Sequence, residues 1–323
     1  MTRICVFGAG AIGGLIGARL ARADVADVAL VARGAHLEAM QAKGLSVTQA
    51  GETFTVHPKV SADPRELGRQ DYVILTLKAY ALPGIVDALA PLIGPDTVLL
   101  FGQNGLPWWY FYKHGGRFDG HILESVDPGG LLWKTLGPER ALGAVIWQAA
   151  ELGAPGHIVH GFGDRLTIGE PSGEISDRAR KLSALLERAG VKSPVRADLR
   201  NEIWLKLWGN LSFNPVSVLT GGTLEALARD PGTRAVLAAM MEEARAIGEA
   251  LGVVFSVSVE ERLDMAAKVG AHRSSMLQDV DAGRPTELDA LLGAVIELAQ
   301  MTGIATPALK LVYDLARFRV LAA

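Results

Sequence analysis

Residues 3–13 read Arg-Ile-Cys-Val-Phe-Gly-Ala-Gly-Ala-Ile-Gly, a short apolar run that passes directly into closely spaced glycines. The apolar run at 3–7 predicts a buried strand, and the helical spacing of residues 12–23 predicts a helix after it. A strand, a glycine-rich turn and a helix in this order are typical of the phosphate-binding turn of a dinucleotide-binding fold. The residues predicted to line this turn are Gly8, Ala9, Gly10, Ala11, Ile12 and Gly13.

The three glycines of the turn have separate physical roles. Gly8 permits the tight turn, Gly10 lets a pyrophosphate approach the backbone, and Gly13 lets helix and strand pack closely. The pyrophosphate would then face the amide groups and the positive end of the helix. A glycine-rich turn that binds no ligand is the alternative, but the strand–turn–helix context favours dinucleotide binding.

The residue after the second predicted strand, at 27–32, indicates which dinucleotide is bound. NAD-specific sites usually place an acidic side chain there, whereas this sequence has Arg33. An arginine attracts a 2′-phosphate and can bind it with two hydrogen bonds, so the sequence predicts NADP(H) rather than NAD(H). A solvated loop arginine is the alternative. Lys78 follows the strand predicted at 72–77, at the strand end where ligands bind, and an exposed loop lysine is an equally good interpretation.

Strand and helix signals alternate as far as residue 101, which predicts the α/β class. Helices are expected at 34–43 and from 77 to about 92, a hairpin at 45–57, and a strand at 97–101. From about residue 120, strand signals at 121–126, 144–151, 157–160 and 165–169 lack full helices between them and predict a sheet extension, followed by a helix at 175–189. We therefore expect an N-terminal Rossmann-type doubly wound parallel sheet followed by an all-α C-terminal domain.

The strand signals nearly vanish after residue 198. Helical patterns cover about 198–213, 223–228, 231–251, 257–280 and 287–302. The predicted domains are therefore 1–197, an NADP-binding Rossmann-type domain, and 198–323, a helical substrate or catalytic domain.

Composition excludes several classes of protein. The 323 residues are 49% hydrophobic and 21% charged with a formal charge of −3, a balance typical of soluble globular proteins that gives no electrostatic case for nucleic acid or a membrane surface. The single cysteine, Cys5, cannot form an internal disulfide or a cysteine-based zinc site.

The histidines do not suggest a metal site either. His157 and His160 make a poor metal pair because strand residues three apart point to opposite faces, so no metal site is expected. No signal peptide is evident, and glycines, asparagines and a proline interrupt the apolar stretch 207–224, so a cytoplasmic protein is predicted.

Lys206, Asn210 and Asn214 recur every four residues and therefore share one face of a helix. Their neighbours are apolar, and a polar group buried there without a partner costs about 1–3 kcal/mol. Satisfied core polar groups or a lysine that reaches water are the alternatives, but the preceding dinucleotide domain favours a catalytic face. A second cluster holds Ser275 and, twelve residues later, Glu287. Capping by Thr286, with Glu287 in the first turn of a helix, is the structural alternative for that carboxylate.

Six motifs stand in order along the chain, which are Gly8–Gly13, Lys78-Ala79, Gln103-Asn104-Gly105, Lys206 to Pro215, Ser274 to Asp279, and Thr286 to Asp289. Taken together, these motifs resemble the ketopantoate reductase (2-dehydropantoate 2-reductase) family, and the resemblance runs from about residue 3 to 315. It implies an NADPH-dependent reduction of 2-dehydropantoate to pantoate, on the route to pantothenate and coenzyme A. A family relative that reduces another branched 2-oxo acid and a non-catalytic NADP(H)-binding regulator are the alternatives.

The resemblance also implies roles for single residues. Lys206 is implied to be the general acid, and Glu287 to hold the substrate hydroxyl and orient that lysine. Ser275 is implied to bind the substrate carboxylate, and Arg33 with Lys78 to form the basic pair around the adenosine phosphate. The asparagines implied to contact substrate are Asn104, which also lies near the nicotinamide, Asn210 and Asn214.

Two questions stay open from the sequence. An apolar helix would lower the pKa of Lys206 whereas Glu287 would raise it, and the sequence does not decide between them. Residues 108–112 are five consecutive aromatics, where many family members have small and polar residues. They either reshape the substrate pocket, or cover the sheet or a subunit contact, so the identity of the 2-oxo acid is left open. The apolar helical half is compatible with a homodimer.

Overall fold

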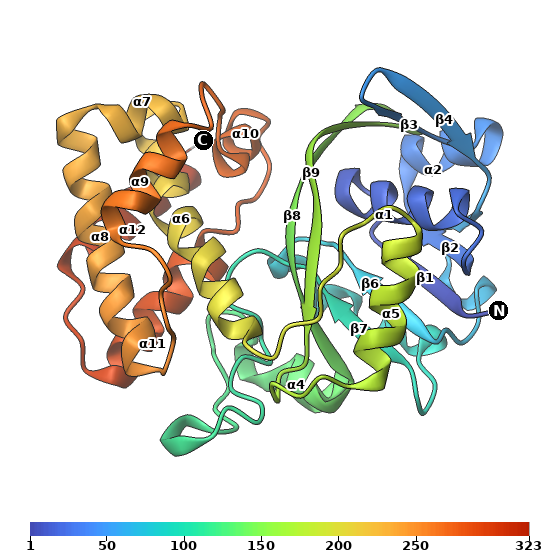
Figure 1. Ribbon diagram of the computed structural model, residues 1–323, viewed down its shortest axis with the longest axis horizontal. Coiled ribbons are helices and arrows are strands. Elements are labelled where there is room, and N and C mark those ends of the chain that lie inside the picture. Colours follow the sequence, from blue (N-terminus) through green and yellow to red (C-terminus); the bar gives the residue numbers. More distant parts are fainter. Residues whose placement is uncertain (323) are drawn as a thin grey trace. The chain divides into compact units, whose positions relative to one another are not determined.

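The computed structural model describes residues 1–322, and the chain divides into two compact units (Figure 1). The first unit contains Met1–Gln103, Trp109–Ile122 and Leu131–Leu199. The second unit contains the chain from Arg200 onward together with two short segments, Asn104–Trp108 and Leu123–Gly130. These two segments matter for the site because one of them carries Asn104.

The first unit is built on one nine-stranded sheet in the order β4-β3-β9-β8-β7-β6-β1-β2-β5. The strands from β5 across to β8 pair in parallel, which confirms the predicted Rossmann-type sheet. The strands of this parallel part are β1 (Arg3–Phe7), β2 (Asp27–Val31), β5 (Lys59–Ser61), β6 (Tyr72–Leu75), β7 (Val98–Phe101) and β8 (Ala141–Ala154).

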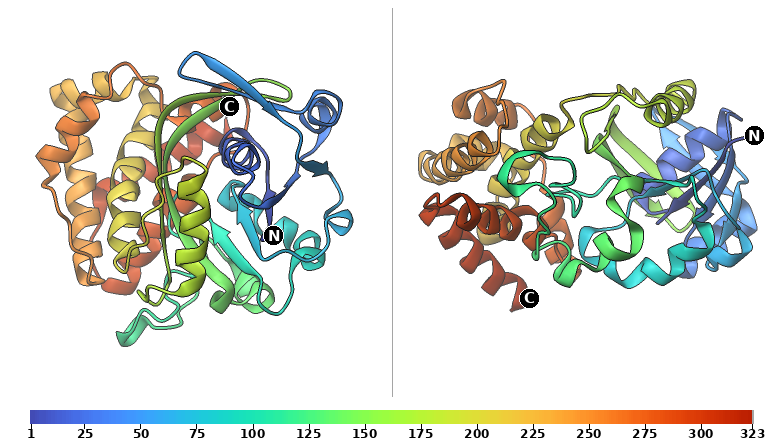
Figure 2. Two further views of the ribbon diagram at one scale, coloured as in Figure 1. Left: turned by 45° about the vertical axis from the view of Figure 1, so that its right-hand side comes forward. Right: turned by 90° about the horizontal axis from the view of Figure 1, so that it is seen from below.

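The sheet extension predicted after residue 120 is a long antiparallel ribbon of β8 and β9 (His157–Gly169), seen as two curved green strands in Figure 2. The hairpin predicted at 45–57 forms as β3 (Leu45–Gln49) and β4 (Glu52–Val56), and β3 pairs in parallel with β9. The hairpin therefore extends the same sheet instead of standing apart from it.

Apolar residues on both faces of the central strands explain why the sheet is buried. All four residues of β6 and of β7 are buried, a pattern expected where helices cover a parallel sheet. Helix α1 (Ala11–Arg22) and helix α5 (Asp177–Arg188) share one core cluster with the strands. Leu15 of α1, Leu182 of α5 and Val6 of β1 belong to that cluster and are fully buried. Helix α2 (Gly34–Lys43) follows β2 as predicted.

Two predicted elements of the first half are wrong. Only Val86–Leu89 (α3) is α-helical in the predicted helix 77–92, and short 3₁₀ turns make up most of the rest, because Pro83 and Pro91 remove backbone donors there. The predicted strand 121–126 is a turn, in which the backbone amide of Val126 donates to the carbonyl of Leu123. Helix α4 (Leu131–Leu136) follows it.

Helices make up the second unit from residue 200 onward. The pattern predicted as one helix at 257–280 is two, because the chain turns at Gly270 with φ +84° and Ser274 caps a new helix. The last helix was not predicted. The helices are α6 (Leu199–Thr220), α7 (Leu224–Arg229), α8 (Pro231–Ala250), α9 (Val259–Ala267), α10 (Ser275–Asp281), α11 (Ala294–Thr302) and α12 (Pro307–Leu321). Among the helices within residues 1–322, none is long and apolar enough to cross a membrane.

Candidate functional site

The glycine-rich turn between β1 and α1 has room for a ligand at one place and none elsewhere. Gly8 adopts φ +98°, which permits the sharp turn out of the strand. A Cβ on Gly13 would lie 2.3 Å from the carbonyl oxygen of Gly8 and from Oγ1 of Thr76, so helix and strands pack too closely for a side chain. A Cβ on Gly10, by contrast, would meet no heavy atom of residues 1–322 within 4 Å. The open space at Gly10 fits the close approach of a pyrophosphate.

The start of α1 is also electrostatically suited to an anion. Gly10 is the N-cap, and the first turn reads Ala-Ile-Gly-Gly, so it brings no negative side chain toward the amide groups. The partial positive charge of the helix N-terminus therefore faces the turn. This donor set fits the phosphates of a dinucleotide.

Two side chains that sequence analysis missed hold this turn in place. Oγ1 of Thr76 donates to the Gly8 carbonyl at 2.8 Å. The ring of His36 bridges two backbone groups, with Nε2 2.8 Å from the Ala9 carbonyl and Nδ1 accepting from the Gly156 amide at 2.9 Å. Because Nδ1 accepts, Nε2 must carry the proton, so His36 ties the turn to the β8–β9 connection. Its position three residues after Arg33 gave no periodic signal in the sequence.

Arg33 and Lys78 flank the turn on the first unit. Arg33 is exposed and is the N-cap of α2, directly after β2. Lys78 is half-buried and follows β6. Since β2 and β6 are the two neighbours of β1, both cations lie at the carboxyl edge of the sheet beside the glycine turn.

Lys206, Asn210 and Asn214 lie along one face of α6, as their spacing predicts. Lys206 and Asn210 are half-buried, whereas Asn214 is buried. The opposite side of the helix is anchored by Trp208, whose ring lies 4.7 Å from the ring of Phe255 and whose Nε1 donates to the Met241 carbonyl at 2.7 Å. This packing fixes the helix that carries the three polar side chains.

Burial lowers the pKa of Lys206 to about 8, and the nearby Glu287 carboxylate partly opposes that fall. Desolvation therefore outweighs the charge of Glu287, which answers the question that the sequence left open. A lysine with a pKa near 8 is largely protonated at neutral pH and gives up its proton more readily than an ordinary lysine. Such a group is suited to general acid catalysis.

Glu287 is buried with 5% of its surface exposed, and its Oε2 accepts a hydrogen bond of 3.1 Å from Nδ2 of Asn104. Its backbone carbonyl accepts from the Leu291 amide, so Glu287 itself stands at the start of the next helix. The Glu287 carboxylate and the Asn104 amide thus form a polar pair next to Lys206.

The chain around Asn104 is fastened to the helix that follows Glu287. Gly105 adopts φ +90°, and the amide of Leu106 donates to the Ala290 carbonyl at 3.0 Å. Residues Asp289–Gly293 form a π-helical turn, a rare geometry that is often found at functional sites. The hydroxyl of Tyr313 donates to Oδ1 of Asp289 at 2.7 Å and holds this turn from α12.

The two adjacent serines of the second cluster have different positions. Ser274 is buried, caps α10 by accepting from the Leu277 amide at 3.1 Å, and shares a hydrogen bond with the Ser217 hydroxyl on α6. Ser275 is exposed and opens α10. Ser274 therefore joins two helices, whereas Ser275 presents its hydroxyl at the surface of the second unit.

The aromatic run at 108–112 is divided between the two units. Trp109 is 1% exposed in the first unit, and its ring lies against β8 so closely that a Cβ on Gly143 would come within 2.5 Å. Tyr110 and Phe111 are fully buried and pack edge-to-face with centroids 5.0 Å apart. The Trp109 ring therefore covers β8, which favours the structural interpretation for that residue. Trp108 is buried in the second unit, close along the chain to Asn104.

The predicted site residues therefore fall into two groups. The first unit carries the glycine turn, Arg33 and Lys78. The second unit carries the residues predicted to handle the substrate, which are Asn104, Lys206, Asn210, Asn214, Ser275 and Glu287.

Comparison with known proteins identifies the family of the chain. The family model described as ketopantoate reductase PanE/ApbA matches residues 4–173, and its C-terminal counterpart matches residues 198–320. A 2-dehydropantoate 2-reductase of Mesorhizobium japonicum is 51% identical over 98% of this chain and 97% of its own length. A 2-dehydropantoate 2-reductase of Halobacterium salinarum is 30% identical over 98% of each chain.

Solved structures agree with the sequence comparison. The structure of a PanE/ApbA family ketopantoate reductase from Ralstonia eutropha has a TM-score of 0.85 and 27% identity, covering 99% of both chains. A 2-dehydropantoate 2-reductase from Geobacter metallireducens has a TM-score of 0.85 and 28% identity, covering 98% of this chain and 99% of its own. Both family models, the relatives and the fold therefore show that this chain belongs to the ketopantoate reductase family.

Proposed function

We propose that this protein reduces 2-dehydropantoate to pantoate with NADPH, a step on the route to pantothenate and coenzyme A. The observation that carries the proposal is Lys206 of α6, whose pKa burial lowers to about 8, beside the buried carboxylate of Glu287. Two relatives that match nearly the whole chain are named for the same reaction. In this proposal residues 1–197 bind the cofactor, and residues 198–323 together with Asn104 bind and protonate the substrate.

The first unit supplies a binding site that fits NADP(H). The open space at Gly10 and the N-terminus of α1 accept the pyrophosphate, and Arg33 and Lys78 neutralise the 2′-phosphate. When bound, NADPH supplies the hydride that the substrate carbonyl carbon receives.

The second unit supplies the proton and holds the substrate. As the C2 carbonyl is reduced, negative charge grows on its oxygen, and the Lys206 ammonium stabilises that charge and then donates its proton. Glu287 accepts a hydrogen bond from the substrate hydroxyl and keeps Lys206 in place, while Asn104 fixes the orientation of the Glu287 carboxylate. The remaining contacts to the substrate come from Asn210, Asn214 and Ser275.

A second candidate is the reduction of another branched 2-oxo acid by the same residues. Trp108 supports it, because this large buried ring lies four positions after Asn104 where many family members have small or polar residues. The hydride and proton steps would be unchanged, and only the size of the accepted side chain would differ. A regulator without catalytic activity is disfavoured, since Lys206, Asn210, Ser275 and Glu287 are all present.

The test measures NADPH oxidation by the purified protein against a panel of 2-oxo acids of increasing branching. We expect the highest kcat/KM for 2-dehydropantoate and a strong preference for NADPH over NADH. A higher kcat/KM for another branched 2-oxo acid would support the second candidate, and no turnover of any acid would support the regulator.

Assembly and location stay predictions. We propose a cytoplasmic enzyme whose partner is its small-molecule substrate and not nucleic acid or a membrane. A homodimer is the predicted assembly, which the molar mass in solution from light scattering checks.

A further inference from the structure

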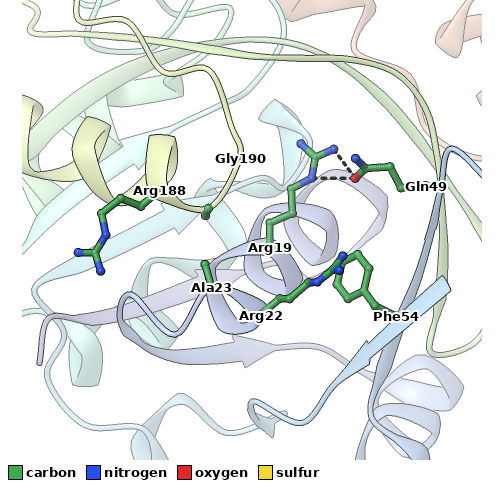
Figure 3. Close-up of a pocket in the computed structure, with 8 residues that line it drawn as sticks. Arg19, Arg22, Ala23, Gln49, Phe54, Arg188 and Gly190 are labelled. Carbon is green, nitrogen blue, oxygen red and sulfur yellow. Dashed lines mark hydrogen bonds between the residues drawn. The ribbon is translucent and has the colours of Figure 1, made fainter. Parts of the chain in front are cut away.

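A cavity of about 300 Å³ lined by three arginines lies on the first unit, away from the glycine-rich turn (Figure 3). It is bounded by the last turns of α1 and α5 and by the β3–β4 hairpin. Because α1 has twelve residues and rises about 1.5 Å per residue, the cavity lies roughly 18 Å from the turn at the other end of that helix. The residues that line it are Arg19, Arg22, Ala23, Gln49, Phe54, Arg188, Ala189 and Gly190.

Arg19 is a buried cation with an unused donor. Only 5% of Arg19 is exposed, and its Nε and Nη2 both donate to Oε1 of Gln49, at 3.2 and 2.7 Å. Its Nη1 is buried and has no hydrogen-bond partner among residues 1–322. In Figure 3 the nitrogen without dashed lines lies on the side of the guanidinium turned away from Gln49. A buried N–H group of a charged side chain that makes no hydrogen bond destabilises the fold, so an acceptor beside Nη1 would be stabilising.

The charges around the cavity are unbalanced. Arg22 lies with its guanidinium 4.2 Å from the ring centroid of Phe54, and Arg188 ends α5. The carboxylate that acts on Arg19 is Asp164, which itself forms an ion pair of 3.0 Å with Lys192. The lining itself therefore holds three arginines and no acidic side chain, in a chain whose net charge is −3.

Helix stability explains only part of this cluster. Cations in the last turn of a helix interact favourably with its negative end, and Arg19 and Arg22 of α1 and Arg188 of α5 all have such positions. This effect accounts for the exposed side chains of Arg22 and Arg188. It does not account for burial of the Arg19 guanidinium, nor for the unused donor at Nη1.

We propose that this cavity binds a small oxyanion, the phosphate or carboxylate group of a metabolite, with Arg19 as the buried anchor. A guanidinium offers paired donors that match the oxygens of either group. Arg188, which is exposed, and Arg22, held against Phe54, supply further positive charge at the rim. The cavity is at the small end of the range for ligand pockets, so the ligand is smaller than a nucleotide. The site is independent of the proposed reductase chemistry.

The test titrates the NADPH-saturated protein with potassium phosphate and, separately, with malonate, at ionic strength held constant with potassium chloride. Saturating cofactor keeps the anions from the glycine turn. The readouts are Tm and the heat of binding. We expect a saturable rise in Tm with at least one of the two anions, and the anion that acts identifies the group recognised.

Three variants decide where the anion binds. Arg19→Met removes the anchor, and Arg188→Ala removes an exposed cation and so leaves the fold intact. We expect Arg19→Met to abolish the response and Arg188→Ala to raise the Kd of the anion about tenfold, the scale of one charged hydrogen bond. Arg180→Ala, on the same helix and paired with Asp177 at 3.3 Å, is the matched control and should bind the anion normally.

The proposal is overturned if Tm follows ionic strength alone, or if Arg188→Ala and Arg180→Ala respond alike. The Arg188→Ala comparison holds even if Arg19→Met fails to fold. Reductase activity of Arg188→Ala should equal that of the unaltered protein, so this result is separate from the test of the proposed function.

Discussion

Asn104 and Glu287 are 183 positions apart in the chain, yet Nδ2 of Asn104 donates a 3.1 Å hydrogen bond to Oε2 of Glu287. The pair is held by its neighbours, because the next two residues of the Asn104 segment lie against the Ala290 carbonyl within the π-helical turn. A carboxylate oriented in this way can hold a substrate hydroxyl and a nearby ammonium in one geometry. The attachment of the 104–108 segment to the second unit is therefore a requirement of the proposed chemistry.

Gly105→Ala tests this attachment. A Cβ at residue 105 would lie 2.3 Å from the Ala290 carbonyl oxygen, and the φ of +90° is unfavourable for any residue with a Cβ. The segment must shift, so Asn104 should no longer reach Glu287. We expect a higher KM for the 2-oxo acid and a lower kcat, with the Kd of NADPH little changed, measured by steady-state kinetics and fluorescence titration.

Gly115→Ala is the matched control for that substitution. Gly115 also has a positive φ, +78°, but its Cβ would meet no atom within 4 Å in the described part of the chain. Strain of the backbone alone, about 1–3 kcal/mol, should then lower Tm while KM stays the same. Equal changes in KM for the two variants would contradict the proposed role of the Asn104 segment.

Arg33→Asp tests the choice of cofactor. Arg33 is exposed directly after β2, and an acidic residue there would repel a 2′-phosphate and favour ribose hydroxyls. We expect NADPH binding to weaken by about 1.5–3 kcal/mol, the scale of a charged hydrogen bond, with NADH much less affected. Titration of both cofactors checks this, with Arg180→Asp on α5 as a control. Equal losses for NADPH and NADH would remove Arg33 from the site.

Trp108→Ala and Trp109→Ala separate the two interpretations of the aromatic run. Trp109 lies against Gly143 in the core of the first unit, so its truncation should destabilise the fold by about 3–5 kcal/mol and leave the ranking of 2-oxo acids unchanged. Trp108 is in the second unit near Asn104, so its truncation should favour bulkier 2-oxo acids. Urea denaturation and kcat/KM for the panel provide the measurements. A changed ranking in Trp109→Ala would show that the sheet-covering interpretation is incomplete.

Local patterns were enough to predict the parallel sheet, because each central strand is apolar on both faces and each adjoining loop carries its own signal. The helix face of Lys206, Asn210 and Asn214 followed from spacing alone. Prediction failed where structure depends on residues distant in sequence. The apolar residues of 77–92 have helical spacing, yet Pro83 and Pro91 leave only one α-helical turn.

The parts of the candidate site that the sequence did not predict are contacts between distant segments. Nothing near His36 indicates that its ring joins the Ala9 carbonyl to the Gly156 amide. Nothing near Glu287 indicates that Asn104 contacts it or that the following turn is π-helical. The pKa of Lys206 could not be predicted from local sequence either. Burial lowers this pKa and the Glu287 charge raises it, and the balance depends on how tightly the folded chain surrounds the amine.

The pH dependence of reduction follows from that pKa. A general acid must be protonated, and Lys206 loses its proton at about pH 8, so kcat should fall as the pH rises through 8. Glu287 raises the pKa of Lys206, and Glu287→Gln should therefore move the fall in kcat to lower pH. The same variant should raise KM, because an amide accepts a hydrogen bond from the substrate hydroxyl less strongly. A kcat that is constant from pH 7 to about 10 would exclude Lys206 as the proton donor.

Lys206→Met removes the charge and the proton while keeping an unbranched stem of similar length. We expect kcat to fall by at least about 10²-fold, the usual contribution of a general acid, with the Kd of NADPH nearly unchanged because the first unit carries the cofactor residues.

The same substitution, Lys206→Met, should raise the stability of the folded protein while it lowers kcat. Burial lowers the pKa of Lys206 from 10.5 to about 8, so the folded state disfavours the ammonium at every pH below 8, and that penalty fades as the pH rises toward 10.5. The Tm of Lys206→Met should therefore exceed that of the unaltered protein at pH 7 and approach it near pH 10.5, whereas Lys268→Met, at an exposed position of the second unit, should change neither kcat nor Tm. A folded, NADPH-binding Lys206→Met protein that reduces 2-dehydropantoate at the unaltered rate would contradict the proposed mechanism.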